Sequence, residues 1–95
     1  MRKYVIAFMS TSYEDALREH TFGILDGVFD TQEEAKVEAA KRIKMFQEEY
    51  IKGKDEIECN VDGYYSNKYY YTDLEIFVSG ALVLFYQFKI MEIRI

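Results

Sequence analysis

Hydrophobic positions between residues 32 and 52 recur with the period of an α-helix. The apolar residues are spaced by four, four, three and four, so they lie on one side of such a helix; they are Ala35, Ala39, Ile43, Phe46 and Tyr50. Thr31 stands where an N-cap is needed, and Glu34 completes a capping box. Gly53 ends the pattern. We therefore predict a helix over residues 32–52 whose apolar stripe packs against a sheet.

The other apolar segments have the lengths and alternation of β-strands. They are residues 3–9, 21–29, 57–61, 74–78 and a long final strand that begins at Ala81. Residues 3–9 are apolar at both phases, which favours a central position in the sheet. Gly23 and Gly27 loosen the second strand and indicate a bulge or bend. Ser79-Gly80 is typical of a tight hairpin turn into the final strand.

Two segments allow more than one interpretation. Residues 12–17 carry a weak capping pattern and form either one helical turn or an open loop. In the final strand the apolar positions change from even to odd numbers near Ile90, and the strand continues apolar to Ile95. Either a bulge near Ile90 or a strand covered on both faces explains this change.

The order of these elements, β-β-α-β-β-β, predicts an α+β fold. One long helix would lie across a small, mainly antiparallel sheet of about five strands, a number that follows from the segments above. The 95 residues are enough for one domain, residues 1–95, and 49% hydrophobic and 31% charged residues are ordinary for a globular chain. No apolar run has the length that spans a bilayer, so we expect no membrane partner.

Candidate catalytic groups are few. His20 is the single histidine, so a site with two histidine ligands is excluded, and we interpret His20 as a polar residue just before a strand. Cys59 shares the apolar phase of Ile57 and Val61, which favours a small core residue over a reactive thiol. The lone cysteine also gives no argument for an oxidising compartment, so we expect a cytoplasmic protein. We expect no enzyme activity, cofactor or metal.

Negative charge and tyrosine coincide in one part of the chain. Residues 55–75 contain six acids and one base, Lys68, so this segment carries the whole formal charge of −5. The same segment contains five of the nine tyrosines. We predict a partner-binding strand-loop-strand surface made of Asp62, Tyr64, Tyr65, Tyr69, Tyr70, Tyr71, Asp73 and Glu75. Such a surface suits a basic protein, through charge steering and cation–π contacts.

Plain sheet packing is the alternative explanation for the tyrosines. In a strand Tyr69 and Tyr71 would point one way and Tyr70 the other, so some of the rings would cover the core. Nucleic acid is a poor partner for either arrangement, because base-stacking surfaces need positive charge to hold phosphates.

The general profile resembles that of small phage and mobile-element proteins that block host nucleases or defence complexes, some by imitating DNA. This resemblance of character implies a small acidic inhibitor or adaptor that binds a basic surface, in some cases as a mimic of nucleic acid. The alternative hypothesis is a small-ligand-binding domain whose tyrosines line a pocket, formed within one chain or at a dimer interface. A homodimer through the final strand or the sheet face around Met91 and Ile93 would bury the excess apolar surface there. The alternative is that the first strand and residues 10–20 cover this region within one chain.

Overall fold

The computed structural model describes residues 1–13 and 19–94 and has one helix packed against a five-stranded antiparallel sheet. The elements are β1 (Arg2–Ser12), β2 (Glu19–Ile24), α1 (Gln32–Ile51), β3 (Ile57–Ser66), β4 (Tyr69–Val78) and β5 (Ala81–Arg94). The strand order in the sheet is β2-β1-β5-β4-β3, with every neighbouring pair antiparallel. The predicted α+β class and element order are confirmed.

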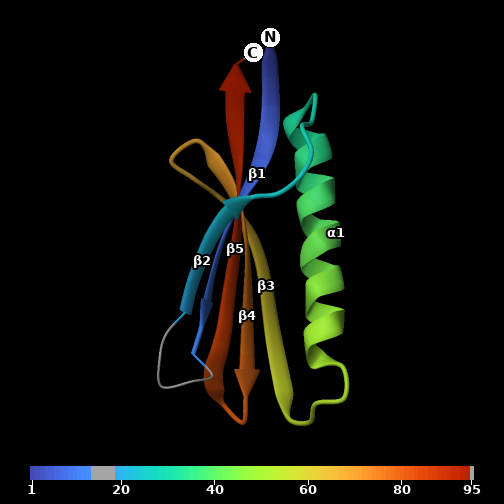
Figure 1. The fold of residues 1–95 in the computed structure, drawn as a ribbon, viewed down its shortest axis with the longest axis vertical. Helices are drawn as coiled ribbons and strands as arrows, with labels where there is room; N and C mark the ends of the chain where they lie inside the picture. The colour runs from blue at the N-terminus through green and yellow to red at the C-terminus, as the bar shows by residue number, and fades with distance from the viewer. Residues whose placement is uncertain (14–18, 95) are drawn as a thin grey trace.

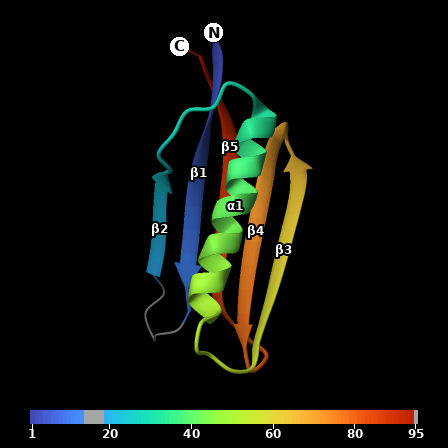
Figure 2. The same ribbon diagram turned by 90° about the vertical axis from the view of Figure 1, so that its right-hand side faces the viewer.

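Among the described elements, α1 covers one face of the sheet. Figure 1 shows α1 along one side of the twisted sheet, with no other described helix or strand over the opposite side. Figure 2 looks onto α1 and shows it across β1, β5 and β4, while β2 and β3 form the two edges. The molecule is elongated, 46 × 24 × 23 Å, with the helix parallel to its long axis. We call the side away from α1 the open face.

The core lies between α1 and the central strands. The helix buries Ala35, Ala39 and Ile43 completely, and Phe46 and Tyr50 pack beside them, so the predicted apolar stripe is confirmed. Across from the helix the sheet contributes buried residues from three strands; they are Ile6, Leu74, Ile76, Leu84, Phe88 and Ile90. The Thr31 hydroxyl accepts a hydrogen bond from the Glu34 amide at 3.1 Å, and the Glu34 carboxylate accepts one from the Asp30 amide at 3.4 Å.

The final strand occupies the centre of the sheet and not an edge. β5 pairs with β1 from Arg2↔Arg94 to Ser12↔Leu84 and with β4 on its other side. The hypothesis of a dimer through a free edge of this strand is therefore wrong, because both edges are already paired within one chain. The edges that remain available belong to β2 and β3.

The structure tests two predicted details of β5, the turn that precedes it and the irregularity within it. The Ser79-Gly80 turn is confirmed, with φ of 50° and 83° at its two residues. The irregularity in the strand lies at Val83 and not near Ile90. Val83 has no register partner in β4, because it falls between the pairs Ile76↔Leu84 and Phe77↔Leu82. Ile90 faces the helix, while the odd-numbered residues Met91 and Ile93 point to the open face. Apolar residues therefore occur at both phases because both faces of the strand carry them.

The boundaries of other elements differ from the predictions. β2 ends at Ile24, and Phe29 forms only an isolated bridge with Tyr4. Ser12 is the last residue of β1, and the remainder of the segment expected to form a helical turn falls largely on residues 14–18, outside the described residues. The expected loop between the third and fourth strands is a two-residue turn, in which Asn67 and Lys68 have φ of 49° and 74°. The tyrosines therefore lie within strands.

Each edge strand contains a glycine that lies beneath an aromatic ring. A Cβ atom at Gly23 of β2 would be 2.6 Å from the ring of Phe8, its partner in β1. A Cβ atom at Gly63 of β3 would overlap the hydroxyl of Tyr70 in β4. Because glycine has no side chain, each ring can lie directly over the backbone of the edge strand. This close contact explains why glycine occupies these two edge positions.

Candidate protein-binding face

The alternation of the two strands sorts the predicted site residues onto opposite faces. Tyr70 packs against the helix-side core, and Tyr65 is its cross-strand partner, so these two lie on the helix side. The other six candidates lie together on the open face; they are Asp62, Tyr64, Tyr69, Tyr71, Asp73 and Glu75. We call these six residues the acidic tyrosine face. The prediction of one surface for all eight is corrected in this respect.

A hydrogen-bond network fixes the middle of the acidic tyrosine face. The hydroxyl of Tyr64 donates to Asp73 Oδ2 at 2.8 Å, and Gln87 Nε2 donates to Asp73 Oδ1 at 2.9 Å and to the Tyr64 hydroxyl at 3.2 Å. The Tyr64 ring stacks on Tyr71, with centroids 5.5 Å apart. Burial, followed by the hydrogen bond to Asp73, raises the pKa of the Tyr64 phenol. Both oxygens of Asp73 are thus held by neutral donors.

Two carboxylates stand directly opposite each other on this face. Asp62 of β3 and Asp73 of β4 are register partners, which places their Cβ atoms about 5 Å apart by standard sheet geometry. Like charges at opposite positions destabilise a pair of strands. Asp73 has the donors of Tyr64 and Gln87, whereas Asp62 is exposed. Asp62 is therefore the more accessible carboxylate of this pair.

A lysine from the neighbouring strand already contacts the tyrosine rings. Lys89 is the register partner of Tyr71 in β5, and its Nζ lies 4.0 Å from the ring centroid of Tyr69 and 5.9 Å from that of Tyr71. Sequence reasoning missed Lys89 and Gln87 as members of this site. Their odd numbers place them on the same face of the strand as Met91 and Ile93, which the sequence could show. The pairing of this strand with β4, which brings them beside the tyrosines, was not predictable.

The two helix-side tyrosines bind a lysine of α1. Lys36 Nζ lies 4.4 Å from the Tyr65 centroid and 4.6 Å from the Tyr70 centroid, and it also donates to the Tyr65 hydroxyl and to Glu33. The rings of Tyr65 and Tyr70 meet edge to face at 5.0 Å. The bond to Tyr65, more than the one to Glu33, raises the pKa of the Lys36 ammonium. These tyrosines serve to dock β3 and β4 on the helix.

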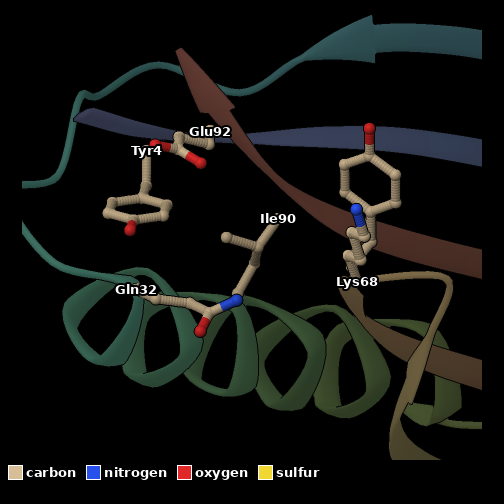
Figure 3. A pocket seen from close by; sticks show the side chains of 6 residues that line it. Tyr4, Gln32, Lys68, Ile90 and Glu92 are labelled. Atoms are coloured by element: carbon tan, nitrogen blue, oxygen red, sulfur yellow. The ribbon is translucent and has the colours of Figure 1, made fainter. Parts of the chain in front are cut away.

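A hollow of about 360 Å³ lies where the β3–β4 turn approaches the start of α1. Figure 3 shows Tyr4 and Glu92 on one side of it, Gln32 of the helix below and Lys68 on the other side. Tyr69 and Ile90 complete the lining. This hollow mixes one cation, one carboxylate and two phenol rings, so it has the chemistry to accept a small polar molecule.

Part of the open face outside the acidic tyrosine face is apolar. Phe22 and Ile24 of β2 are 70% and 64% exposed, and their alternation places them on this side beside Ala7 and Met9 of β1. Met91 follows across β1 in β5. These five residues form what we call the apolar half of the open face. Phe22 and Ile24 are exposed and the other three are half-buried, and a contiguous apolar patch of this kind is typical of interaction surfaces.

His20 and Cys59, the other candidates named from the sequence, each have a contact that gives them a structural role. His20 lies inside β2 and not before it, with Nδ1 3.0 Å from the Thr11 hydroxyl. Cys59 packs beside the helix-side core, and burial raises the pKa of its thiol, which keeps the sulfur protonated. Among the described residues, no three potential metal-binding side chains come together. The helix in the described part of the chain has no apolar stretch long enough to cross a membrane.

Comparison of the chain with protein-family models, with curated proteins and with solved structures gives no match in any of the three.

Proposed function

We propose that this protein is a small non-enzymatic interaction protein whose acidic tyrosine face binds a basic surface of another protein. The observation that carries the proposal is the opposition of Asp62 and Asp73 on an uncovered sheet face. Their mutual repulsion disfavours the free state, and a cation from a partner would relieve it. The site is therefore built at a cost to stability that binding recovers.

The surroundings of the two carboxylates support a protein partner. Tyrosine gives a large and rigid contact with a polar tip, and Tyr64 is held in place by Asp73 and by its stack with Tyr71. Glu75 continues the negative charge along β4. A rigid acidic surface with aromatic rings matches the arginines and lysines of a basic protein in both charge and shape.

The proposed role is that of an inhibitor or adaptor of the phage or mobile-element type, acting in the cytoplasm. If the partner's basic surface is a nucleic-acid groove, the carboxylates of this face would take the positions of phosphates. The protein would then act as a mimic of nucleic acid without binding nucleic acid itself.

Binding of a labelled peptide of alternating arginine and lysine, followed by fluorescence anisotropy, tests the proposal. We expect binding at low ionic strength that weakens as salt is added. The double variant Asp62→Asn/Glu75→Gln should lose roughly tenfold in affinity. The control Glu48→Gln/Glu49→Gln removes two charges from exposed helix positions and should lose far less. Equal losses would show that only net charge matters and would overturn the proposal.

A second candidate function uses the hollow beside the β3–β4 turn. Its mixed lining of Tyr4, Tyr69, Lys68 and Glu92 favours a small polar ligand with charges of both signs (Figure 3). Native mass spectrometry of the purified protein tests this alternative. A retained small molecule that is lost in Lys68→Ala supports it, and bare protein under gentle conditions argues against it.

We also propose a homodimer that covers the apolar half of the open face. The exposed Phe22 and Ile24 would be removed from water by a second copy packed face to face. Such packing on the β2–β1 side leaves the acidic tyrosine face of each copy accessible, because that face lies over β3 and β4.

A further inference from the structure

Lys89 places a positive charge inside the acidic tyrosine face. Its ammonium lies 4.0 Å from the Tyr69 centroid, within the range of a cation–π contact, and it is half-buried in the sheet surface. The backbone of Lys89 is paired with Tyr71 of β4, so the central strand itself holds the lysine at this position. The rings that would receive a partner's cation therefore already hold one of the protein's own.

We propose that Lys89 is an internal occupant of the binding site, and that an arginine side chain of the basic partner displaces it. This inference rests on the proposed function. It names the partner group that the site selects and identifies Lys89 as the residue that limits affinity.

Arginine fits this site better than lysine for three reasons. Its planar guanidinium stacks on aromatic rings, and it is more weakly hydrated than an ammonium, so it loses less on leaving water. Tyr71 is held in place by its stack with Tyr64, with the ring planes 17° apart, so it offers a fixed ring for such a contact. Asp62 supplies a carboxylate that the guanidinium can contact through two nitrogens.

The neighbouring carboxylate explains why the incoming charge is directed to Asp62. Tyr64 and Gln87 hold both oxygens of Asp73 with donors at 2.8 and 2.9 Å. Asp62 is exposed at the opposite position of the register. An arginine that contacts Asp62 and lies over Tyr71 comes close to the Lys89 ammonium, which is 5.9 Å from the Tyr71 centroid. The two cations repel each other, so Lys89 is displaced toward solvent.

Removing the internal occupant should strengthen binding. Lys89→Met keeps a long side chain but no charge, and we expect it to bind a labelled octa-arginine peptide roughly two- to fivefold more tightly than the unaltered protein. Lys41→Met is the control, because it removes the same charge from an exposed position on α1. Lys89→Arg should bind the peptide more weakly, since an internal guanidinium competes better than an ammonium.

The outcomes separate the inference from the function on which it rests. If the unaltered protein binds the peptide and Lys89→Met binds no better than Lys41→Met, the inference is overturned and the binding function stands. If neither the unaltered protein nor Lys89→Met binds the peptide, the proposed function is overturned. Equal affinity for octa-arginine and octa-lysine at the same salt would overturn the preference for arginine.

A measurement on the unaltered protein makes the test independent of any variant. The methylene protons of Lys89 lie beside the Tyr69 ring and should show ring-current shifts in proton NMR. Addition of octa-arginine should move these resonances toward the positions of a solvent-exposed lysine. Resonances that stay in place while the peptide binds would show that Lys89 is not displaced, which overturns the inference.

Discussion

Asp62 is the residue at which we expect stability and binding to oppose each other. It faces Asp73 across the β3–β4 ladder, and only Asp73 has the donors of Tyr64 and Gln87. We expect Asp62→Asn to stabilise the fold by about 0.2–1 kcal/mol, because it removes a like-charge pair from opposite positions. The midpoint of urea unfolding, with an unchanged slope, measures this.

The control for this measurement is Glu48→Gln, an exposed change on α1 that should alter stability by no more than about 0.5 kcal/mol. A clear loss of stability in Asp62→Asn would contradict the interpretation, since it would mean that the carboxylate accepts hydrogen bonds that hold the strand in place.

The pKa of Tyr64 reports on the same network. Burial raises this pKa above the ordinary value of 10.0, and the bond to Asp73 raises it further. The folded state thus holds this proton more tightly than the unfolded chain, so the contribution of Tyr64 to stability is complete below pH 10.0 and declines as the pH rises above it. We expect Asp73→Asn to lower the Tyr64 pKa in the folded protein, with the effect of burial remaining.

Carbon NMR of the tyrosine Cζ atoms measures this titration directly. Asp62→Asn is the matched control, because it removes a carboxylate from the same face without removing the hydrogen bond that Tyr64 donates to Asp73, and it should lower that pKa much less. A Tyr64 pKa that is the same in Asp73→Asn as in the unaltered protein would show that burial alone is responsible.

At the residue scale, the sequence indicated that tyrosines and carboxylates make up the site, but not every residue that belongs to it. The density of tyrosine beside Asp62 and Asp73 was visible in the letters, and alternation correctly separated Tyr70 from Tyr69 and Tyr71. Lys89 and Gln87 come from a strand distant in sequence, and no local pattern specifies which strand lies beside β4.

Among the elements, α1 was the most predictable because its signals are local. The cap at Thr31 and the apolar stripe together define where it begins and which side it buries. β3 and β4 were predicted shorter than they are, at 57–61 and 74–78. Their tyrosine-rich ends continue as strands because tyrosine favours extended backbone and because Asn67-Lys68 turns the chain in two residues.

The buried side of α1 should not tolerate charge. Ile43 is only 1% exposed, so Ile43→Asp places a carboxylate without a partner in the core and should cost roughly 3–5 kcal/mol, enough to unfold much of a small domain. Val37 on the same helix is 70% exposed, and Val37→Asp should change stability by less than about 0.5 kcal/mol. Circular dichroism with heating compares them, and equal melting points would contradict the assignment of the buried side.

The close contact of Tyr70 with Gly63 leads to a prediction for the packing of β3 against β4. Gly63→Ala should destabilise β3 by about 1–3 kcal/mol, because the added methyl group and the Tyr70 hydroxyl occupy the same space. In a Tyr70→Leu background the same change should cost much less, since the hydroxyl is gone. A double-mutant cycle of denaturant midpoints tests this, and additive effects would show that the ring moves aside without cost.

For the whole molecule, we expect the apolar half of the open face to set the oligomeric state. We expect sedimentation equilibrium at micromolar concentration to give twice the chain mass of 11.3 kDa. Phe22→Lys should give a folded monomer, because it places a charge in the apolar half of the open face. Val37→Lys is matched to it, since both side chains are 70% exposed, and should remain dimeric. A monomeric unaltered protein would contradict the dimer.

The position of β5 could not be predicted from the sequence, and the reason lies at this scale. Apolar residues at both phases of the strand are compatible with an exposed edge and with a central position, and the structure shows a central strand with α1 over one face and the open face on the other. Distinguishing these cases requires knowledge of which strands pair, and pairing between distant segments leaves little trace in either one.

The pairing of β1 with β5 also decides the order in which the chain can assemble. Two short turns connect β3, β4 and β5, so this three-stranded unit closes through local contacts, whereas the β1–β5 ladder joins residue 2 to residue 94. Closing so large a loop is slow, because its entropy is lost before the contacts form. Until β1 arrives, one side of β5 is an unpaired and largely apolar strand edge. Refolding should therefore lose yield as protein concentration rises, through pairing between chains at that edge.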